Sequence, residues 1–261
     1  MPRARRWSGG DFGARATCVL APNPSLMTLD GTNTWVLREP DARRSVVVDP
    51  GPLDVGHLDR VAETAGSVAM VLLTHGHSDH SEAARTFSER MRCDVRALDP
   101  AFVLGSEGLH GGDVVEVDGL EIRVVSTPGH TSDSLSFVLP AEAAVLTGDT
   151  VLGRGTTVVA HPDGELGAYL GSLRRLRDLA EARKVEMVWP GHGPVLADAL
   201  GVLDHYLQHR AERLEQVREA VADGAVEAAD VVRRVYADVD PQLWPAAELS
   251  VRAQLAYLAS G

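Results

Sequence analysis

The sequence predicts an α/β fold in which helices cover β-sheets, followed by a small helical domain. Over most of the 261 residues, short runs rich in Val, Ile, Leu and Thr alternate with turns and a few helical segments. Near Ala199 the composition changes, and apolar residues then recur at helical spacing. We therefore expect one domain over residues 1–198 and a second over 199–261.

The expected strands are short β-rich runs bounded by Gly, Pro, Asp or Asn. Asp118-Gly119 lies between two of them and is typical of a tight hairpin. The runs are Ala16–Leu20, Thr34–Leu37, Ser45–Asp49, Val68–Thr74, Val114–Val117, Glu121–Ser126, Ser134–Leu139, Ala144–Thr147 and Glu186–Trp189.

The expected helices are recognised by apolar periodicity and by their breakers. In the first domain they are His57–Ala65, Ser81–Met91 and Ala168–Arg183. In the second domain a long helix starts at about Ala199 and ends at Gly224. Shorter helices follow at Ala228–Tyr236 and Ala246–Leu258, separated by Pro241 and Pro245.

Composition limits the classes of partner and compartment. The formal net charge of -12 argues against a broad, sequence-independent grip on nucleic acid, so no DNA partner is expected. Cys18 and Cys93 form no CxxC pair, which favours a reducing cytoplasm. No apolar segment follows the basic N-terminus, and the apolar runs are too short to span a bilayer. We expect neither a secretory signal nor a membrane partner.

The strongest chemical signal follows the run Val68–Leu73. There a strand ends, and His75, His77, Asp79 and His80 emerge within six residues. Strand alternation sends His75 and His77 to the same side, and the turn into the next helix brings Asp79 and His80 round to them. Imidazole and carboxylate groups suit zinc. A polar loop with chance histidines is the weaker interpretation.

Three later segments repeat this arrangement of a β-run, then Gly or Pro, then a ligand-type residue. They place His130, Asp149 and His192 at the ends of expected strands. Glycine lets the backbone turn sharply beside a bound ion. One such segment alone is weak evidence, but the four segments in this order form a specific pattern.

This pattern of HxHxDH, a later His, an Asp and a last His resembles the metallo-β-lactamase superfamily. The resemblance implies a four-layer αββα sandwich with a dinuclear zinc site at one edge. It implies that the first ion is held by His75, His77 and His130. It also implies that Asp79, His80 and His192 hold the second ion and that Asp149 bridges both.

Two adjacent ions explain why no Ser or Cys nucleophile is needed. Ions about 3.5–4 Å apart share a water and lower its pKa to about 7, which yields hydroxide at neutral pH. Asp79 is the expected catalytic residue, because a carboxylate at this position orients the attacking oxygen or passes on its proton.

Three further segments resemble one subgroup, the lactamase-beta-like proteins. They are Asn23–Trp35, Gly153–Thr157 and Tyr206–Arg210. The group contains a mammalian mitochondrial single-strand endoribonuclease, and fungal thioesterases that act on acyl carrier proteins are similar. Its members carry a small winged-helix-like C-terminal domain. The apolar face of the long helix must be buried, so we expect this domain to form one wall of the cleft.

Other residues carry weaker signals. Asn33, Thr156 and Thr157 are candidate substrate contacts, with ordinary turn or loop chemistry as the alternative. His205 and His209 have the i,i+4 spacing of a metal pair, but a packed or solvated helix face is the better interpretation. For Tyr169 the sequence leaves the role open.

The sequence therefore predicts a dinuclear zinc hydrolase, with single-stranded RNA as the first choice of substrate. The alternative is a thioesterase or acyl hydrolase, although Ser81-Glu82-Ala83 replaces the Gly pair usual in the glyoxalase II type. A β-lactamase, an iron-dependent persulfide dioxygenase and a binding module without activity rank lower. The short chain between His80 and His192 excludes the larger RNA-processing types with inserted domains. A homodimer is left open.

Overall fold

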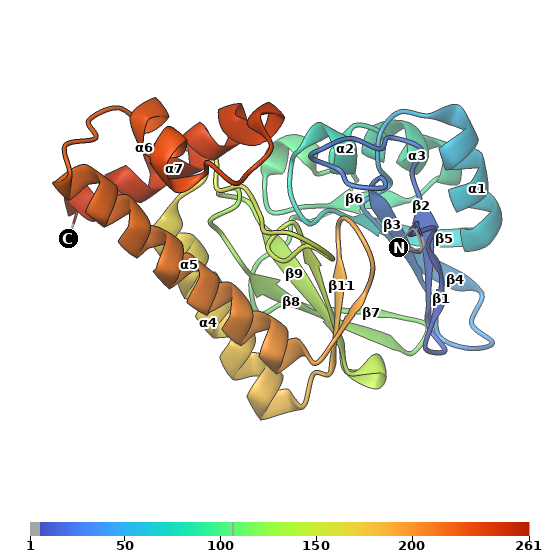
Figure 1. Ribbon diagram of the computed structural model, residues 1–261. Coiled ribbons are helices and arrows are strands. Elements are labelled where there is room, and N and C mark those ends of the chain that lie inside the picture. Colours follow the sequence, from blue (N-terminus) through green and yellow to red (C-terminus); the bar gives the residue numbers. More distant parts are fainter. Residues whose placement is uncertain (1–5, 106, 261) are drawn as a thin grey trace.

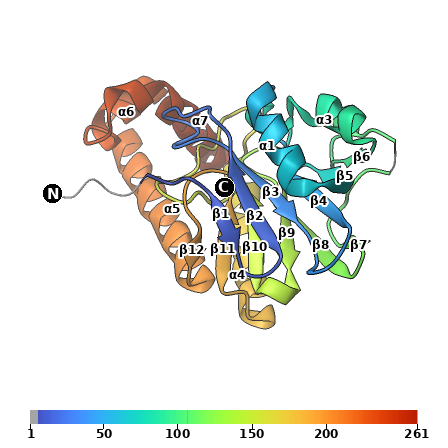
Figure 2. The same ribbon diagram turned by 90° about the vertical axis from the view of Figure 1, so that its right-hand side faces the viewer.

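The computed structural model describes residues 6–105 and 107–260; the basic N-terminal residues 1–5 lie outside the described part. Two six-stranded mixed sheets stack against each other, with helices on both outer sides (Figures 1 and 2). The first sheet has the order β1 (Gly10–Phe12), β2 (Ala16–Leu20), β3 (Asn33–Leu37), β4 (Arg44–Val48), β5 (Ser67–Leu72), β6 (Asp94–Arg96). The second has the order β12 (Leu196–Ala197), β11 (Met187–Pro190), β10 (Ala144–Gly148), β9 (Leu135–Leu139), β8 (Leu120–Ser126), β7 (Val114–Val117).

The central strands β3, β9 and β10 are buried on both faces, which explains their continuous apolar runs. In β3, Trp35 and Leu37 point into the core between the sheets, whereas Val36 packs under the outer helices. This alternation follows from the two-residue period of a strand. Across the core, the ring of Trp35 stacks on that of Trp189 from β11, with centroids 5.1 Å apart.

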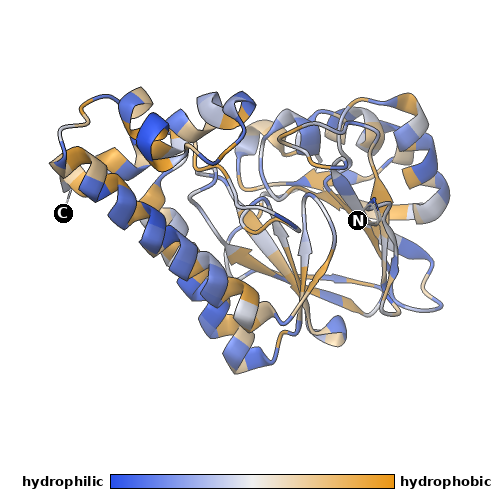
Figure 3. Cartoon of the chain, in the orientation of Figure 1, coloured by the Kyte–Doolittle hydropathy of each residue, from blue (hydrophilic) through white to orange (hydrophobic). Residues whose placement is uncertain are grey.

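The outer layers complete the αββα sandwich that the sequence predicted. Helices α1 (Val55–Ala65) and α3 (Ala84–Met91) cover the first sheet, and α4 (Leu166–Arg183) with the start of α5 (Ala199–Ala222) covers the second. Figure 3 shows apolar residues along the strands and hydrophilic residues over much of α4 and α5.

One expected helix, Ser81–Met91, is divided in the structure. A short helix α2 (Ser78–Ser81) begins directly after His77, and α3 starts only at Ala84. The break arises because the Ala83 N–H donates to the carbonyl of Gly51, at 3.1 Å, instead of continuing the helix. The early start of α2 is what brings Asp79 and His80 round to the strand end.

Three strands, β1, β6 and β12, were not predicted. They lie at sheet edges, are two or three residues long, and carry no β-rich run. β6, for example, has the sequence Asp-Val-Arg and is extended because it pairs in parallel with Met70–Leu72. Pairing with a distant partner defines such strands, so local propensity does not reveal them.

The C-terminal part is helical, as expected, with α5, α6 (Ala228–Val235), the 3-10 turn η3 (Pro241–Leu243) and α7 (Trp244–Ser260). Its own small core includes Val217, Val231 and Val251. The first half of α5 packs instead with α4, through residues such as Leu203. The boundary predicted at 198 thus falls at the start of a helix shared by both cores. Among the described helices, none is long and apolar enough to cross a membrane.

Candidate metal centre

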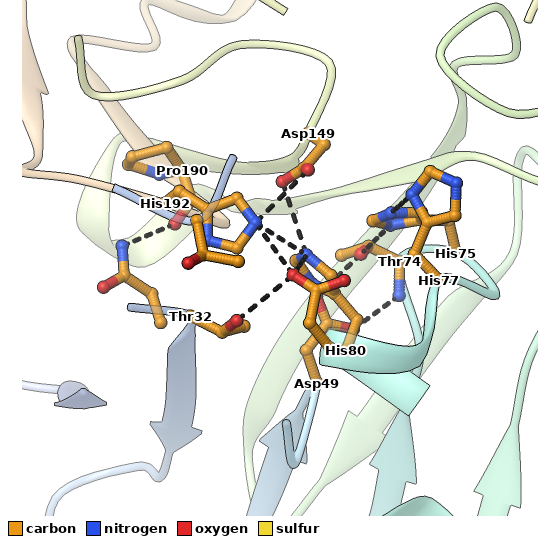
Figure 4. Close-up of polar contacts among 12 residues, drawn as sticks. Thr32, Asp49, Thr74, His75, His77, His80, Asp149, Pro190 and His192 are labelled. Atoms are coloured by element: carbon orange, nitrogen blue, oxygen red, sulfur yellow. Dashed lines mark hydrogen bonds and ion pairs between the residues drawn. The ribbon is translucent and has the colours of Figure 1, made fainter. Parts of the chain in front are cut away.

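Five histidines and two aspartates converge at one end of the sandwich. Figure 4 shows His75, His77, His80, Asp149 and His192 among them. All lie at or just beyond the ends of β5, β8, β10 and β11, where the sheets provide rigid support and the loops open to a cleft. The cluster consists of the seven residues predicted from the sequence: His75, His77, Asp79, His80, His130, Asp149 and His192.

The side chains form two groups of donor atoms. In the first, Nδ1 of His77 lies 3.0 Å from Nε2 of His75 and 3.1 Å from Nε2 of His130. In the second, Nε2 of His192 lies 3.2 Å from Nε2 of His80 and 3.1 Å from Oδ2 of Asp79. These groups correspond to the two ligand sets implied by the family resemblance.

Asp149 lies between the groups. One of its carboxylate oxygens is 3.4 Å from Nε2 of His80, and the other is 3.3 Å from His192 and 3.7 Å from His130. Oδ1 of Asp149 is buried and has no hydrogen-bond partner among the described residues. A buried carboxylate oxygen without a partner is costly, and a cation would satisfy it.

The donor set fits a pair of divalent ions. Ligands about 2.0–2.1 Å from a tetrahedral zinc are separated by roughly 3.3 Å, close to the separations within each group. The seven nitrogen and oxygen atoms lie close together, and most belong to buried residues. There is no room between them for a hydrogen atom on each one. The site is therefore a candidate dinuclear His/Asp metal centre.

The ring nitrogens that face away from the centre are also engaged. Nδ1 of His130 lies 2.8 Å from the carbonyl oxygen of Val158, and Nδ1 of His192 lies 3.2 Å from that of Gly31. Because a carbonyl can only accept, both histidines carry their hydrogen on Nδ1. Their Nε2 atoms therefore face the centre, where a bound metal ion would replace any hydrogen on them.

Asp49 accepts the Nδ1 hydrogen of His80 in the same way, although no sequence pattern marked this residue. Its buried carboxylate lies 2.8 Å from Nδ1 of His80 and accepts hydrogen bonds from the backbone N–H and hydroxyl of Thr74, at 2.8 and 2.6 Å. Its only sequence signal is its place at the end of β4, before Pro50-Gly51.

Electrostatics favour cation binding here. Burial acts to raise the pKa of the Asp149 carboxyl, but His192 and His80 outweigh it and hold the pKa well below the usual value. Burial likewise opposes ionisation of Asp79, yet a hydrogen bond from His192 helps to lower its pKa to about 2. Both aspartates are therefore carboxylates at neutral pH and attract positive charge.

Of the predicted substrate contacts, Asn33 has a different role. Its side chain is fully buried, and its amide group donates to the carbonyls of Pro190 and Gly193, at 2.9 and 2.8 Å. Both amide hydrogens are used, so none is left for a substrate. Asn33 instead fixes the loop that carries His192.

Thr156 and Thr157 do line the cleft. Thr157 is buried, and its hydroxyl donates to the carbonyl of Asp149 at 2.6 Å, which makes it a neighbour of the centre. Tyr169 is buried and donates to the carbonyl of Thr150 at 2.7 Å.

The cleft beside the centre is a cavity of about 390 Å³. His130 and Asp149 form its inner end, and residues of α5, η3 and α7 form the opposite wall. This confirms that the C-terminal domain walls the cleft. His209 lines the cavity, whereas His205 is exposed, and neither belongs to a metal-type cluster among the described residues.

Comparison with known proteins agrees with this geometry. Residues 27–192 match the family described as the metallo-β-lactamase superfamily, and residues 228–260 match the β-lactamase-associated winged helix domain. The C-terminal helical domain is thus of the winged-helix type.

Relatives extend over most of the chain. A β-lactamase-like protein 2 homologue from Drosophila melanogaster is 31% identical over 92% of this chain and 86% of its own length. An atrochrysone carboxyl ACP thioesterase from Aspergillus chevalieri is 32% identical over 86% of this chain and 74% of its own. A β-lactamase domain protein from Burkholderia ambifaria shares the fold, with a TM-score of 0.80, 21% identity, and coverage of 99% and 91% of the two chains.

Proposed function

Because the chain belongs to the metallo-β-lactamase superfamily, we propose that this hydrolase uses two zinc ions and cleaves acyl thioesters. His75, His77 and His130 would hold one ion, and Asp79, His80 and His192 would hold the other. Asp149 would serve both. The donor groups described above support this division. The two free cysteines suit a reducing cytoplasm as its compartment.

The bound ions would supply an activated water and polarise the scissile carbonyl. The protein's own contribution is orientation. The Asp79 carboxylate accepts from the hydroxyl of Thr32 at 3.3 Å and faces the centre, where it would accept a hydrogen bond from the attacking water. Because its carboxyl group is ionised at neutral pH, Asp79 would orient the water through this hydrogen bond.

The observation that carries the choice of substrate is the lining of the cleft. Between the centre and the C-terminal wall the cavity is mostly apolar, with Leu29, Leu152, Val158, Leu243 and Ala247 among its lining residues. An acyl chain gains free energy by leaving water for such a surface, whereas a polyanion does not.

Three arginines line the cavity, and each donates to an acceptor within the protein. Arg154 pairs with Asp30 at 2.6 Å, and Arg210 and Arg213 donate to backbone carbonyls. Single-stranded RNA is held by free cations and stacking aromatic groups along a groove. The cavity therefore favours the thioester over the RNA substrate that ranked first from sequence.

Single-stranded RNA is the second candidate, favoured by the segments that resemble the lactamase-beta-like group, which contains a single-strand endoribonuclease. If it is a substrate, the net charge of -12 predicts few phosphate contacts and a shallow salt dependence.

The test compares initial rates on coenzyme A thioesters of increasing acyl length with rates on labelled single-stranded RNA, using zinc-loaded protein. We expect thioester turnover to exceed RNA cleavage by orders of magnitude and to be lost in His77→Ala. RNA cleavage that is faster than thioester turnover, and is lost in the same variant, would reverse the choice. RNA cleavage that survives in the variant identifies a contaminating nuclease.

A further inference from the structure

Two segments singled out in the sequence, Gly153–Thr157 and Tyr206–Arg210, contact each other in the structure. The first belongs to residues 150–159, which we name the ligand loop; the second lies on α5. We infer that Arg210 is a positioning residue, which holds the ligand loop and through it three of the metal ligands. This inference rests on the metal centre of the proposed function.

The ligand loop touches three candidate ligands. The hydroxyl of Thr157 donates to the carbonyl of Asp149 at 2.6 Å, and the carbonyl of Val158 accepts from Nδ1 of His130 at 2.8 Å. At the other end, the N–H of Gly153 donates to the carbonyl of His192 at 2.8 Å. A shift of this loop would therefore disturb residues from both donor groups.

The ligand loop has no helix or strand of its own. Side chains from α5 therefore help to hold its backbone in place. From α5, the hydroxyl of Tyr206 accepts from the N–H of Leu152 at 2.9 Å and lies 3.1 Å from the carbonyl of Gly155. One turn further, the guanidinium of Arg210 donates to the carbonyl of Thr157. These two side chains bind the loop from the side of the C-terminal domain.

Arg210 also braces the start of the loop. Its guanidinium lies over the ring of Tyr169, 4.9 Å from the centroid, and the Tyr169 hydroxyl donates to the carbonyl of Thr150. Arg210 is 6% exposed, and no carboxylate pairs with it within the described part of the chain. A buried cation without a counter-ion is costly, and an apolar side chain would serve packing better. The presence of an arginine at this position fits a role in holding the loop.

The chain supplies a matched control. Arg213, on the same helix, makes the same two kinds of contact: it donates to the carbonyl of Val235 and lies over the ring of Tyr236, at 4.3 Å. Both of these partners belong to the C-terminal domain and not to the ligand loop. Removing Arg213 should loosen that domain without moving the metal ligands.

The experiment measures zinc affinity by competition with a chromophoric chelator, together with thermal unfolding of the zinc-free proteins. We expect Arg210→Met to lose about tenfold or more in zinc affinity, the range found when outer groups of metal sites are removed. Arg213→Met should lower the unfolding temperature yet keep wild-type zinc affinity. Arg210→Lys should recover part of the loss, because an ammonium still donates to a carbonyl but stacks poorly.

Thr157→Val provides a second route if Arg210→Met folds poorly. It removes the hydroxyl that reaches Asp149 and keeps the carbonyl that Arg210 uses. We expect reduced zinc affinity, and less than additive losses in the double variant. Unchanged zinc affinity in both Arg210→Met and Thr157→Val, or equal losses in Arg210→Met and Arg213→Met, would overturn the positioning role. If the wild type itself does not bind two zinc ions, it is the proposed function that fails.

Discussion

Nδ1 of His80 and Oδ2 of Asp49 lie 2.8 Å apart, and both residues are buried behind the metal centre. The carboxylate fixes the tautomer of His80, so that its Nε2 faces the donor group shared with Asp79 and His192. We therefore expect Asp49 to support metal binding at the candidate centre without being a ligand.

We predict that Asp49→Asn lowers zinc affinity and kcat by about 10–100-fold, because one amide oxygen cannot replace the two carboxylate oxygens that accept from Thr74 and His80. Chelator competition and steady-state kinetics measure the two effects. Asp118→Asn removes an exposed carboxylate that pairs with Arg44, and it should change neither quantity. Wild-type zinc affinity in Asp49→Asn would contradict the role of this pair.

Asp149→Ala should cost more than the loss of any single histidine, since its carboxylate faces both donor groups. Elemental analysis should give about two zinc ions per wild-type chain, about one in His77→Ala and one or fewer in Asp149→Ala. Two zinc ions bound with wild-type affinity in Asp149→Ala would show that this residue is not shared. A single iron in the wild type would refute the dinuclear centre.

The apolar wall of the cavity can be tested at Leu243, on η3 and distant in sequence from every candidate ligand. Leu243→Glu places a charge where an acyl chain is proposed to lie. We expect KM for an octanoyl thioester to rise about tenfold, and kcat/KM for an acetyl thioester to stay unchanged. Equal effects on both substrates would mean that the acyl chain does not lie along this wall.

Stability should depend on pH through His57. This residue is fully buried, with Nε2 2.9 Å from the hydroxyl of Thr34. Burial, assisted by nearby Arg60, lowers its pKa to about 4. Between pH 6.5 and 4 the unfolded chain therefore binds a proton that the folded chain does not, and stability falls as the pH falls.

The contribution of His57 amounts to about 2 kcal/mol between pH 7.5 and 5, at 1.36 kcal/mol per pKa unit. Urea unfolding of the zinc-free protein at both pH values gives this loss. His57→Gln should reduce the pH-dependent loss by about that amount, and comparing the two proteins cancels the titration of the metal ligands. Equal losses in both proteins would refute the assignment.

The sequence by itself located the candidate ligands, and its resemblance to a known family implied the sandwich. Each ligand directly follows an apolar run, so a local pattern of strand, turn and donor residue marks it, as at Val68–Asp79. Local periodicity indicated sheets covered by helices, whereas the four-layer order was implied by the family resemblance. The helical C-terminal domain was also visible, since Gly224, Pro241 and Pro245 divide helices of clear apolar spacing.

The tertiary structure alone decided which polar residues support the centre. Asp49 reaches His80 across 31 positions of sequence, and Arg210 reaches Thr157 across 53, so no local pattern connects them. Asn33 looked like a cleft residue because it follows a turn, but the packing of β3 against the His192 loop buried it. The edge strands and the break between α2 and α3 likewise depend on partners far along the chain. Such contacts are settled by burial and by the need to satisfy buried polar groups, and both emerge only when the layers pack.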